Sequence, residues 1–107
     1  MSFLIHETLR TLNTNDVFEF GLTEISKPQD DNDFYQADAT IVKNQAIISR
    51  MKPSGVSEFD VIRSFFAYVG INLRVLQREH RIEFELYGFT LDQYIPLTKS
   101  MREVLEE

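Results

Sequence analysis

The chain has 107 residues, of which 43% are hydrophobic and 26% charged, and its formal net charge is −6. This composition is typical of a globular domain and excludes wholesale disorder. The chain contains no cysteine, which excludes disulfides and thiolate metal sites. Its apolar runs are too short for a membrane span, which needs roughly 18 residues, and the first residues lack the pattern of a secretory signal. We therefore expect a cytoplasmic protein without membrane contact.

Acidic and basic residues are unevenly distributed. Residues 1–39 hold eight acids and two bases, residues 40–81 three acids and seven bases, and residues 82–107 six acids and two bases. The overall acidity argues against general binding to nucleic-acid phosphates, which requires clustered lysine and arginine. A nucleic-acid partner is therefore the last-ranked possibility. The basic side chains that it would use are Arg50, Lys52, Arg74, Arg78 and Arg81.

The first predicted element is a helix over Phe3–Leu12, because its larger apolar side chains recur on one helical face. Residues 13–16, Asn-Thr-Asn-Asp, then predict a turn. From Val17 to Ile25 apolar and polar side chains alternate, which is typical of a half-buried strand. A long polar loop follows over Lys27–Asp33.

Two β-rich runs, Tyr35–Val42 and Ala46–Met51, predict a hairpin. Its two-residue loop is either Lys43-Asn44 or Asn44-Gln45, and these two registers differ by one residue. The sequence pattern leaves both registers open.

A second helix is expected over Ser57–Val69. Ser57 is a suitable N-cap, with Asp60 three residues later in a near capping box. Gly70 follows where a glycine would end the helix. The aromatic side chains Phe59, Phe65 and Phe66 fall within this helix, and we expect them in the core, packed on a sheet.

Alternation then predicts a second hairpin over residues 71–87, closed by Glu79-His80, with Arg74 opposite Glu85. Thr98 begins a short helix over Lys99–Leu105. The expected order is α-β-β-β-α-β-β-α. The sequence thus predicts an α+β fold, a single domain over residues 1–107 with helices packed on an antiparallel sheet.

Motifs for catalysis or metal binding are missing from the sequence. There is no nucleophile elbow and no phosphate loop, and the two histidines have no partner at a useful spacing. The acidic run Asp30–Asp33 lacks the glycine and glutamate that a calcium loop requires. Glu83 and Glu85 lie on the same predicted strand face and could form an acid/base pair. We interpret this face as a solvated outer surface instead. We expect no enzyme activity, no catalytic residue, no cofactor and no metal.

Four aromatic residues are the candidates for contact with a partner protein. Phe34 and Tyr35 follow the acidic loop, and Tyr87 and Tyr94 lie near the carboxyl end. Exposed aromatic side chains anchor protein interfaces more often than most residue types.

The order of elements, the size and the acidity together resemble the class I type III secretion chaperones and the YbjN-like domains that share their fold. The resemblance covers the whole chain, and no motif carries a functional residue over to it. It implies a homodimer that binds extended, unfolded segments of partner proteins along its sheet and helix surface without a nucleotide.

The function expected from the sequence is therefore a non-enzymatic, chaperone-like or adaptor-like module that binds a partner polypeptide. The alternative is a small acidic inhibitor or immunity-type protein, bacterial or phage-borne, that blocks a basic site on a nucleic-acid enzyme. An exposed apolar groove favours the first function, and a continuous acidic face favours the second.

Overall fold

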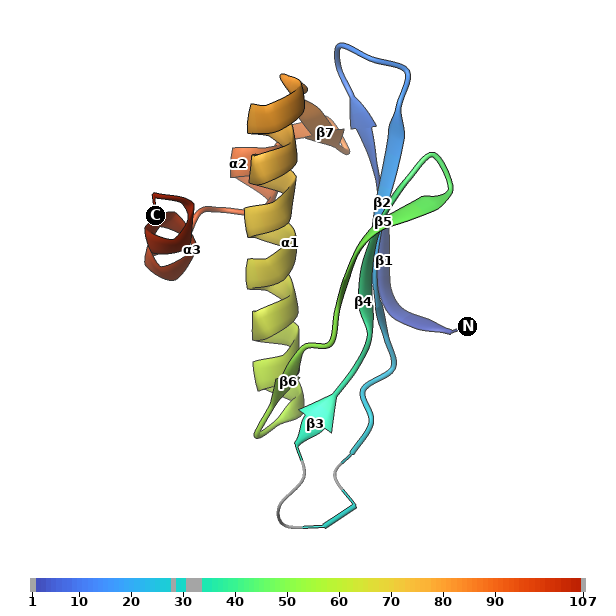
Figure 1. The fold of residues 1–107 in the computed structure, drawn as a ribbon, viewed down its shortest axis with the longest axis vertical. Helices are drawn as coiled ribbons and strands as arrows, with labels where there is room; N and C mark the ends of the chain where they lie inside the picture. Colours follow the sequence, from blue (N-terminus) through green and yellow to red (C-terminus); the bar gives the residue numbers. More distant parts are fainter. Residues whose placement is uncertain (1, 28, 31–33, 107) are drawn as a thin grey trace.

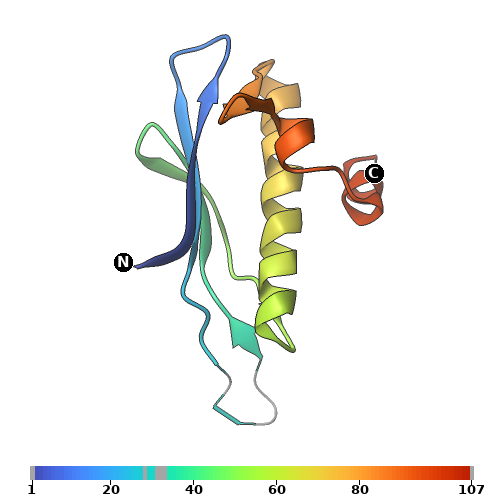
Figure 2. The same cartoon turned by 180° about the vertical axis from the view of Figure 1, so that it is seen from behind.

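The computed structural model describes residues 2–27, 29–30 and 34–106. An antiparallel sheet forms one layer, and the helix α1, Glu58–His80, lies along one of its faces (Figures 1 and 2). The strand order is β5-β4-β2-β1-β7-β8. The strands of this sheet are β1 Phe3–Thr11, β2 Val17–Thr23, β4 Ala39–Lys43, β5 Ala46–Met51, β7 Phe84–Leu86 and β8 Phe89–Thr90. The expected α+β fold with an antiparallel sheet is confirmed.

The remaining elements are short. β3, Tyr35–Gln36, and β6, Ser54–Gly55, pair with each other in a separate two-stranded sheet. α2, Leu91–Tyr94, and α3, Lys99–Leu105, lie on the same side of the large sheet as α1 (Figure 2). The helix predicted over Lys99–Leu105 is confirmed, with Thr98 as its N-cap.

The predicted helix over Phe3–Leu12 is wrong, because Phe3–Thr11 forms strand β1. Residues 12–16 form a short connection that brings β1 antiparallel to β2, so that Leu9 lies opposite Phe18. Leu9 is buried against α1, whereas His6 and Thr8 lie on the outer face of the sheet. The apolar residues of this segment fit a helical face as well as a strand, and pairing with β2 decides between them.

The first predicted hairpin forms between β4 and β5 with the loop Asn44-Gln45, but Tyr35–Gln36 of its predicted first strand belongs to the separate strand β3. Both loop residues have positive φ, 49° and 72°, as a tight turn between twisted strands requires. Asn44 also joins this turn to β2: its side chain accepts a hydrogen bond from the Val17 amide (2.9 Å) and donates one to Asp16 (2.8 Å). The bond from Asn44 lowers the pKa of Asp16 below its usual value.

Helix α1 begins as predicted, since the Ser57 hydroxyl accepts a hydrogen bond from the Asp60 amide (3.2 Å). It does not end at Gly70 but continues to His80 and stops at Arg81, whose φ is 54°. The predicted hairpin over 71–87 is therefore wrong, and so is the pairing of Arg74 with Glu85.

Gly70 has a packing role in the middle of α1. A Cβ atom there would lie 2.0 Å from the Cε of Met101, a buried side chain of α3. The glycine therefore marks the place where α3 approaches the backbone of α1, and it carries no signal for the end of the helix.

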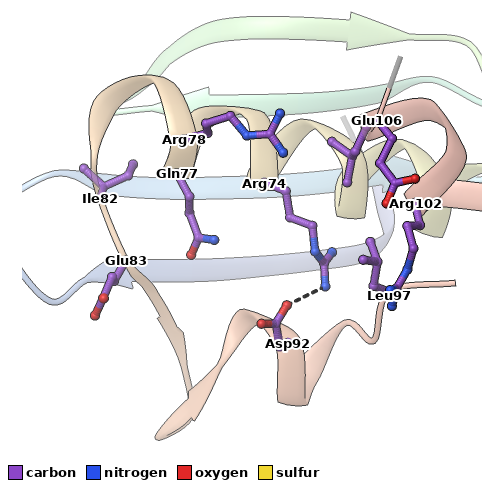
Figure 3. Close-up of a pocket in the computed structure, with 10 residues that line it drawn as sticks. Arg74, Gln77, Arg78, Ile82, Glu83, Asp92, Leu97, Arg102 and Glu106 are labelled. Atoms are coloured by element: carbon purple, nitrogen blue, oxygen red, sulfur yellow. Dashed lines mark hydrogen bonds and ion pairs between the residues drawn. The ribbon is translucent and has the colours of Figure 1, made fainter.

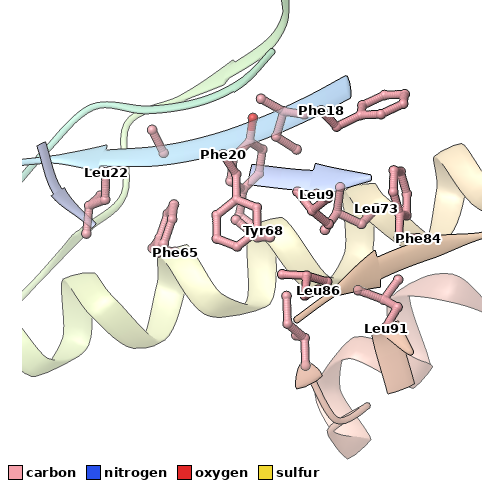
Figure 4. Packing of buried hydrophobic residues seen from close by; sticks show 14 of the residues in the cluster. Leu9, Phe18, Phe20, Leu22, Phe65, Tyr68, Leu73, Phe84, Leu86 and Leu91 are labelled. Carbon is pink, nitrogen blue, oxygen red and sulfur yellow. The ribbon is translucent and has the colours of Figure 1, made fainter. Parts of the chain in front are cut away.

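The core lies between α1 and the inner face of the sheet (Figure 4). Phe65 packs there against Phe20, with ring centroids 6.1 Å apart. The expectation that Phe66 and Phe59 also belong to the core is wrong, because these side chains are 36% and 73% exposed. Phe66 lies on the flank of α1 that is near Ile5 and Glu7 of β1.

Candidate partner-binding groove

One edge of strand β1 is open for most of its length. On one side β1 pairs with β2 from Phe3 to Arg10, whereas on the other side β7 pairs only with Arg10 and Thr11. The chain turns away from β1 directly after β7, because Tyr87 and Gly88 both have positive φ, 52° and 84°. Within the described part of the chain, residues 3–9 therefore have no strand partner on this side.

The open edge offers main-chain hydrogen-bonding groups. The amide of Leu12 donates to the carbonyl of Glu83 on the β7 side (2.9 Å). Since main-chain groups alternate along a strand, those of His6 and Thr8 point to the same side as those of Leu12. Among the described residues no strand pairs with these N–H and C=O groups of His6 and Thr8, so they are available to an incoming strand.

The pairing of β2 with β4 also shows which main-chain groups of β1 face its open edge. The carbonyl of Val17 accepts a hydrogen bond from the Asn44 amide on the β4 side (2.8 Å), so Glu19 and Gly21 also bond towards β4. Glu19 and Gly21 are the residues of β2 opposite Thr8 and His6. Two independent ladders thus leave the same main-chain groups without a strand partner among the described residues.

An apolar groove of about 190 Å³ lies between β1 and α1 beside this edge. Its walls come from both layers, from the last residue of α2 and from the residue that follows it. The lining residues are Ile5 and Glu7 of β1, Phe20 of β2, Ile62, Phe65, Phe66 and Val69 of α1, and Tyr94 and Ile95. All except Glu7 are apolar or aromatic.

The groove exists because one strand position of the sheet is only partly filled. α1 has 23 residues and is about 34 Å long, and the nine residues of β1 span about 30 Å. The three residues of β7 cover only about 10 Å beside β1. Roughly 20 Å of that strand position remains vacant, and the partly exposed Ile62 and Phe66 of α1 face it.

Tyr94 lines the groove, and the exposed Tyr87 lies beside it. The hydroxyl of Tyr87 donates a hydrogen bond to Oε2 of Glu7 (2.6 Å), and the rings of Tyr87 and Tyr94 lie 5.9 Å apart. The hydrogen bond to Glu7, together with its negative charge, raises the pKa of Tyr87 above its usual value. The phenol therefore stays protonated near pH 7 and continues to donate to Glu7.

The four aromatic candidates from the sequence fall into two separate groups. Tyr87 and Tyr94 meet beside the groove, but Phe34 and Tyr35 lie at the far end of the molecule, at β3 (Figure 1). Phe34 is 57% exposed, and Tyr35 is half-buried where β3 pairs with β6. The structure thus brings together one pair and not all four.

Sequence reasoning missed the other groove residues. Ile5 and Glu7 fell in the wrongly predicted helix. Ile62 fell in the predicted helix Ser57–Val69 without being singled out, and Phe66 was expected in the core. The helical spacing of residues 59, 62 and 66 was a usable signal, because these side chains form a stripe beside the buried face of α1.

A second cavity, of about 540 Å³, lies between α1, α2 and α3 (Figure 3). The guanidinium of Arg74, which is 8% exposed, donates to the carbonyls of Gly70 (3.0 Å) and Ile95 (2.6 Å) and to Asp92 (3.0 Å). Arg74 thereby holds the segment around Ile95 against α1 and fixes the end wall of the groove. Its burial also removes it from the basic residues available to a nucleic acid.

The other charges around this second cavity are balanced. Arg78 and Arg102 line it together with Glu83 and Glu106, so no excess of either sign points to a charged ligand. The apolar groove is therefore the stronger candidate for a functional site.

Other classes of site receive no support within the described residues. No group of three or more potential metal-ligating side chains comes together there, and of the acidic run over residues 30–33 only Asp30 is described. In this part of the chain none of the helices has the length and apolar character of a membrane span. Comparison with protein-family models, curated proteins and solved structures gave no significant match.

Proposed function

We propose that this protein is a non-enzymatic polypeptide-binding module, chaperone-like or adaptor-like, that takes up an extended segment of a partner protein beside β1. The observation that carries the proposal is the coincidence of an open strand edge with an apolar groove. An extended guest segment fills the vacant strand position and continues the line of β7. Main-chain bonds to His6 and Thr8 hold it, as in other cases of strand addition.

The guest's side chains divide between the two faces of the sheet. Every second side chain points towards α1 and enters the groove, where it contacts Ile62 and Phe66. The intervening side chains point to the outer face, which carries polar residues such as His6 and Glu19. Guests with alternating apolar and polar residues therefore fit best.

This mode of binding is the one that the resemblance to the secretion chaperones implies. That resemblance rested on an order beginning with a helix, whereas the chain begins with strand β1. The proposal therefore stands on the groove. The groove also favours polypeptide binding over the acidic-inhibitor alternative. A polypeptide binder uses an apolar groove, whereas an inhibitor of that kind would use a continuous acidic face.

The homodimer expected from the sequence stays a prediction. Strand β5 is a terminal strand of the sheet, and among the described residues no strand pairs with its outer edge. Ile47 and Ile48 of β5 are 49% and 43% exposed. Pairing of β5 with a second copy would leave the groove at β1 free for a guest.

Selection from a displayed library of random short peptides tests the proposed function. We expect the immobilised protein to enrich peptides with alternating apolar residues. Phe66→Asp is expected to weaken their binding at least about tenfold, because a charge on the groove wall must be desolvated when the guest binds. Isothermal calorimetry measures the affinities.

Val104→Asp is the matched control. Val104 is an exposed apolar residue of α3, 50% accessible, that does not line the groove. The V104D variant should bind the selected peptides as the wild type does. Equal affinity of the F66D variant and the wild type would contradict binding in the groove.

A further inference from the structure

Glu7 is the exception in an otherwise apolar groove. Among the described residues that line it, Glu7 alone is charged. Its carboxylate lies on the inner face of β1, opposite Phe20 of β2 and close to Tyr94. Glu7 is half-buried in the free protein, and a guest in the groove would remove its carboxylate from water. An ionised group there therefore needs a partner when the groove is filled.

The structure supplies only part of that compensation. Tyr87 donates one hydrogen bond to Oε2 of Glu7. The ion pairs among the described residues are formed by His6, Arg63 and Arg74, and none of them involves Glu7. No lysine, arginine or histidine of the described residues therefore lies within 4.0 Å of the Glu7 carboxylate. An ionised carboxylate can accept about four hydrogen bonds, so Oε1 of Glu7 has capacity left for a further donor.

We propose that the guest segment carries a lysine or arginine at the position that faces Glu7. This inference rests on the proposed function and specifies its partner: an extended segment with the pattern apolar, any residue, basic, any residue, apolar. Facing residues of neighbouring strands share a face of the sheet, so the guest side chain beside Glu7 points into the groove. Side chains two positions away point there as well.

The surroundings of Glu7 suit a long basic side chain. The aliphatic stem of lysine or arginine can lie against Phe66 and the other apolar wall residues. Its charged head then reaches the carboxylate beside the rings of Tyr87 and Tyr94, which also attract cations. The net charge of −6 adds a weaker long-range preference for a basic guest.

Three synthetic peptides test this inference. They share a backbone of alternating valine and threonine and differ only at one central valine, which is replaced by lysine, norleucine or glutamate. Fluorescence anisotropy measures their affinities for the wild type and for Glu7→Gln. Glu83→Gln serves as the control for net charge, because Glu83 is an exposed carboxylate that does not line the groove.

We expect the wild type to bind the lysine peptide roughly tenfold more tightly than the norleucine peptide, and the glutamate peptide least tightly. In the E7Q variant this preference should disappear while the norleucine peptide still binds. The E83Q variant should keep the preference.

The possible failures are distinct. If the wild type binds the lysine and norleucine peptides equally, or if the E7Q variant keeps the preference, the inference about Glu7 is wrong and the groove remains the binding site. If the wild type binds none of the three peptides, the proposed function itself is contradicted.

Discussion

Replacement of Phe65 by alanine is expected to lower the free energy of unfolding by about 3–5 kcal/mol, whereas Phe66→Ala should lower it by only about 1 kcal/mol. The two residues are neighbours of the same type on α1, but Phe65 is 4% exposed and Phe66 is 36% exposed. Removal of the Phe65 ring leaves a cavity against Phe20, while the Phe66 site opens to the groove and to water.

Urea unfolding of the two variants measures this difference, and each serves as the control for the other. The comparison tests how α1 is rotated about its axis over the sheet. Equal losses of stability, or a larger loss for the F66A variant, would place Phe66 in the core and close the groove.

Replacement of His6 by proline is expected to weaken the binding of a selected peptide by about 2–3 kcal/mol, which is roughly 30- to 150-fold. Proline has no amide hydrogen, and its ring occupies the edge where the guest strand must pair. The amide of His6 faces the open side of β1, so the ladder with β2 loses no hydrogen bond. The extended backbone of β1 also suits Ile5, the residue before the new proline.

His6→Ala is the control for the lost imidazole. The His6 side chain lies on the outer face, where it pairs with Glu19 (3.2 Å) and stacks on Phe3. We expect the H6A variant to bind the peptide nearly as the wild type does, with calorimetry again as the measurement. If the H6P and H6A variants bind equally well, the guest does not pair with the edge of β1.

Local signals predicted a good part of the fold. Ser57 and Thr98 were recognisable as N-caps. The alternation over Val17–Ile25 predicted a strand, which forms over Val17–Thr23. The Asn44-Gln45 turn was one of two registers that the sequence allowed. These caps, strands and turns are determined by residues that are close together in the sequence. They can therefore be predicted from the sequence alone.

The errors came from features that long-range contacts decide. Gly70 was interpreted as the end of a helix, but it is there because Met101 of α3 packs on it. The segment Phe3–Thr11 has apolar residues that fit either a helix or a strand, and its pairing with β2 settles the choice. Neither contact can be read from local spacing.

The candidate site was predictable only in part for the same reason. Tyr87 and Tyr94 were identified because exposed aromatic residues anchor interfaces more often than most residue types. Glu7 became visible only once β1 was known to be a strand with an open edge. That edge depends on where β7 stops, which is set by the turn at Tyr87 and Gly88, about 80 residues along the chain from Glu7.

Amide hydrogen exchange along β1, followed by NMR with and without a selected peptide, tests the central claim most directly. In the free protein we expect protected amides at Ile5, Glu7 and Leu9, which face β2, and fast exchange at His6 and Thr8. Binding of the peptide should slow the exchange of His6 and Thr8. If a bound peptide leaves the exchange of these two amides unchanged, the partner does not add a strand to β1, and the account is contradicted.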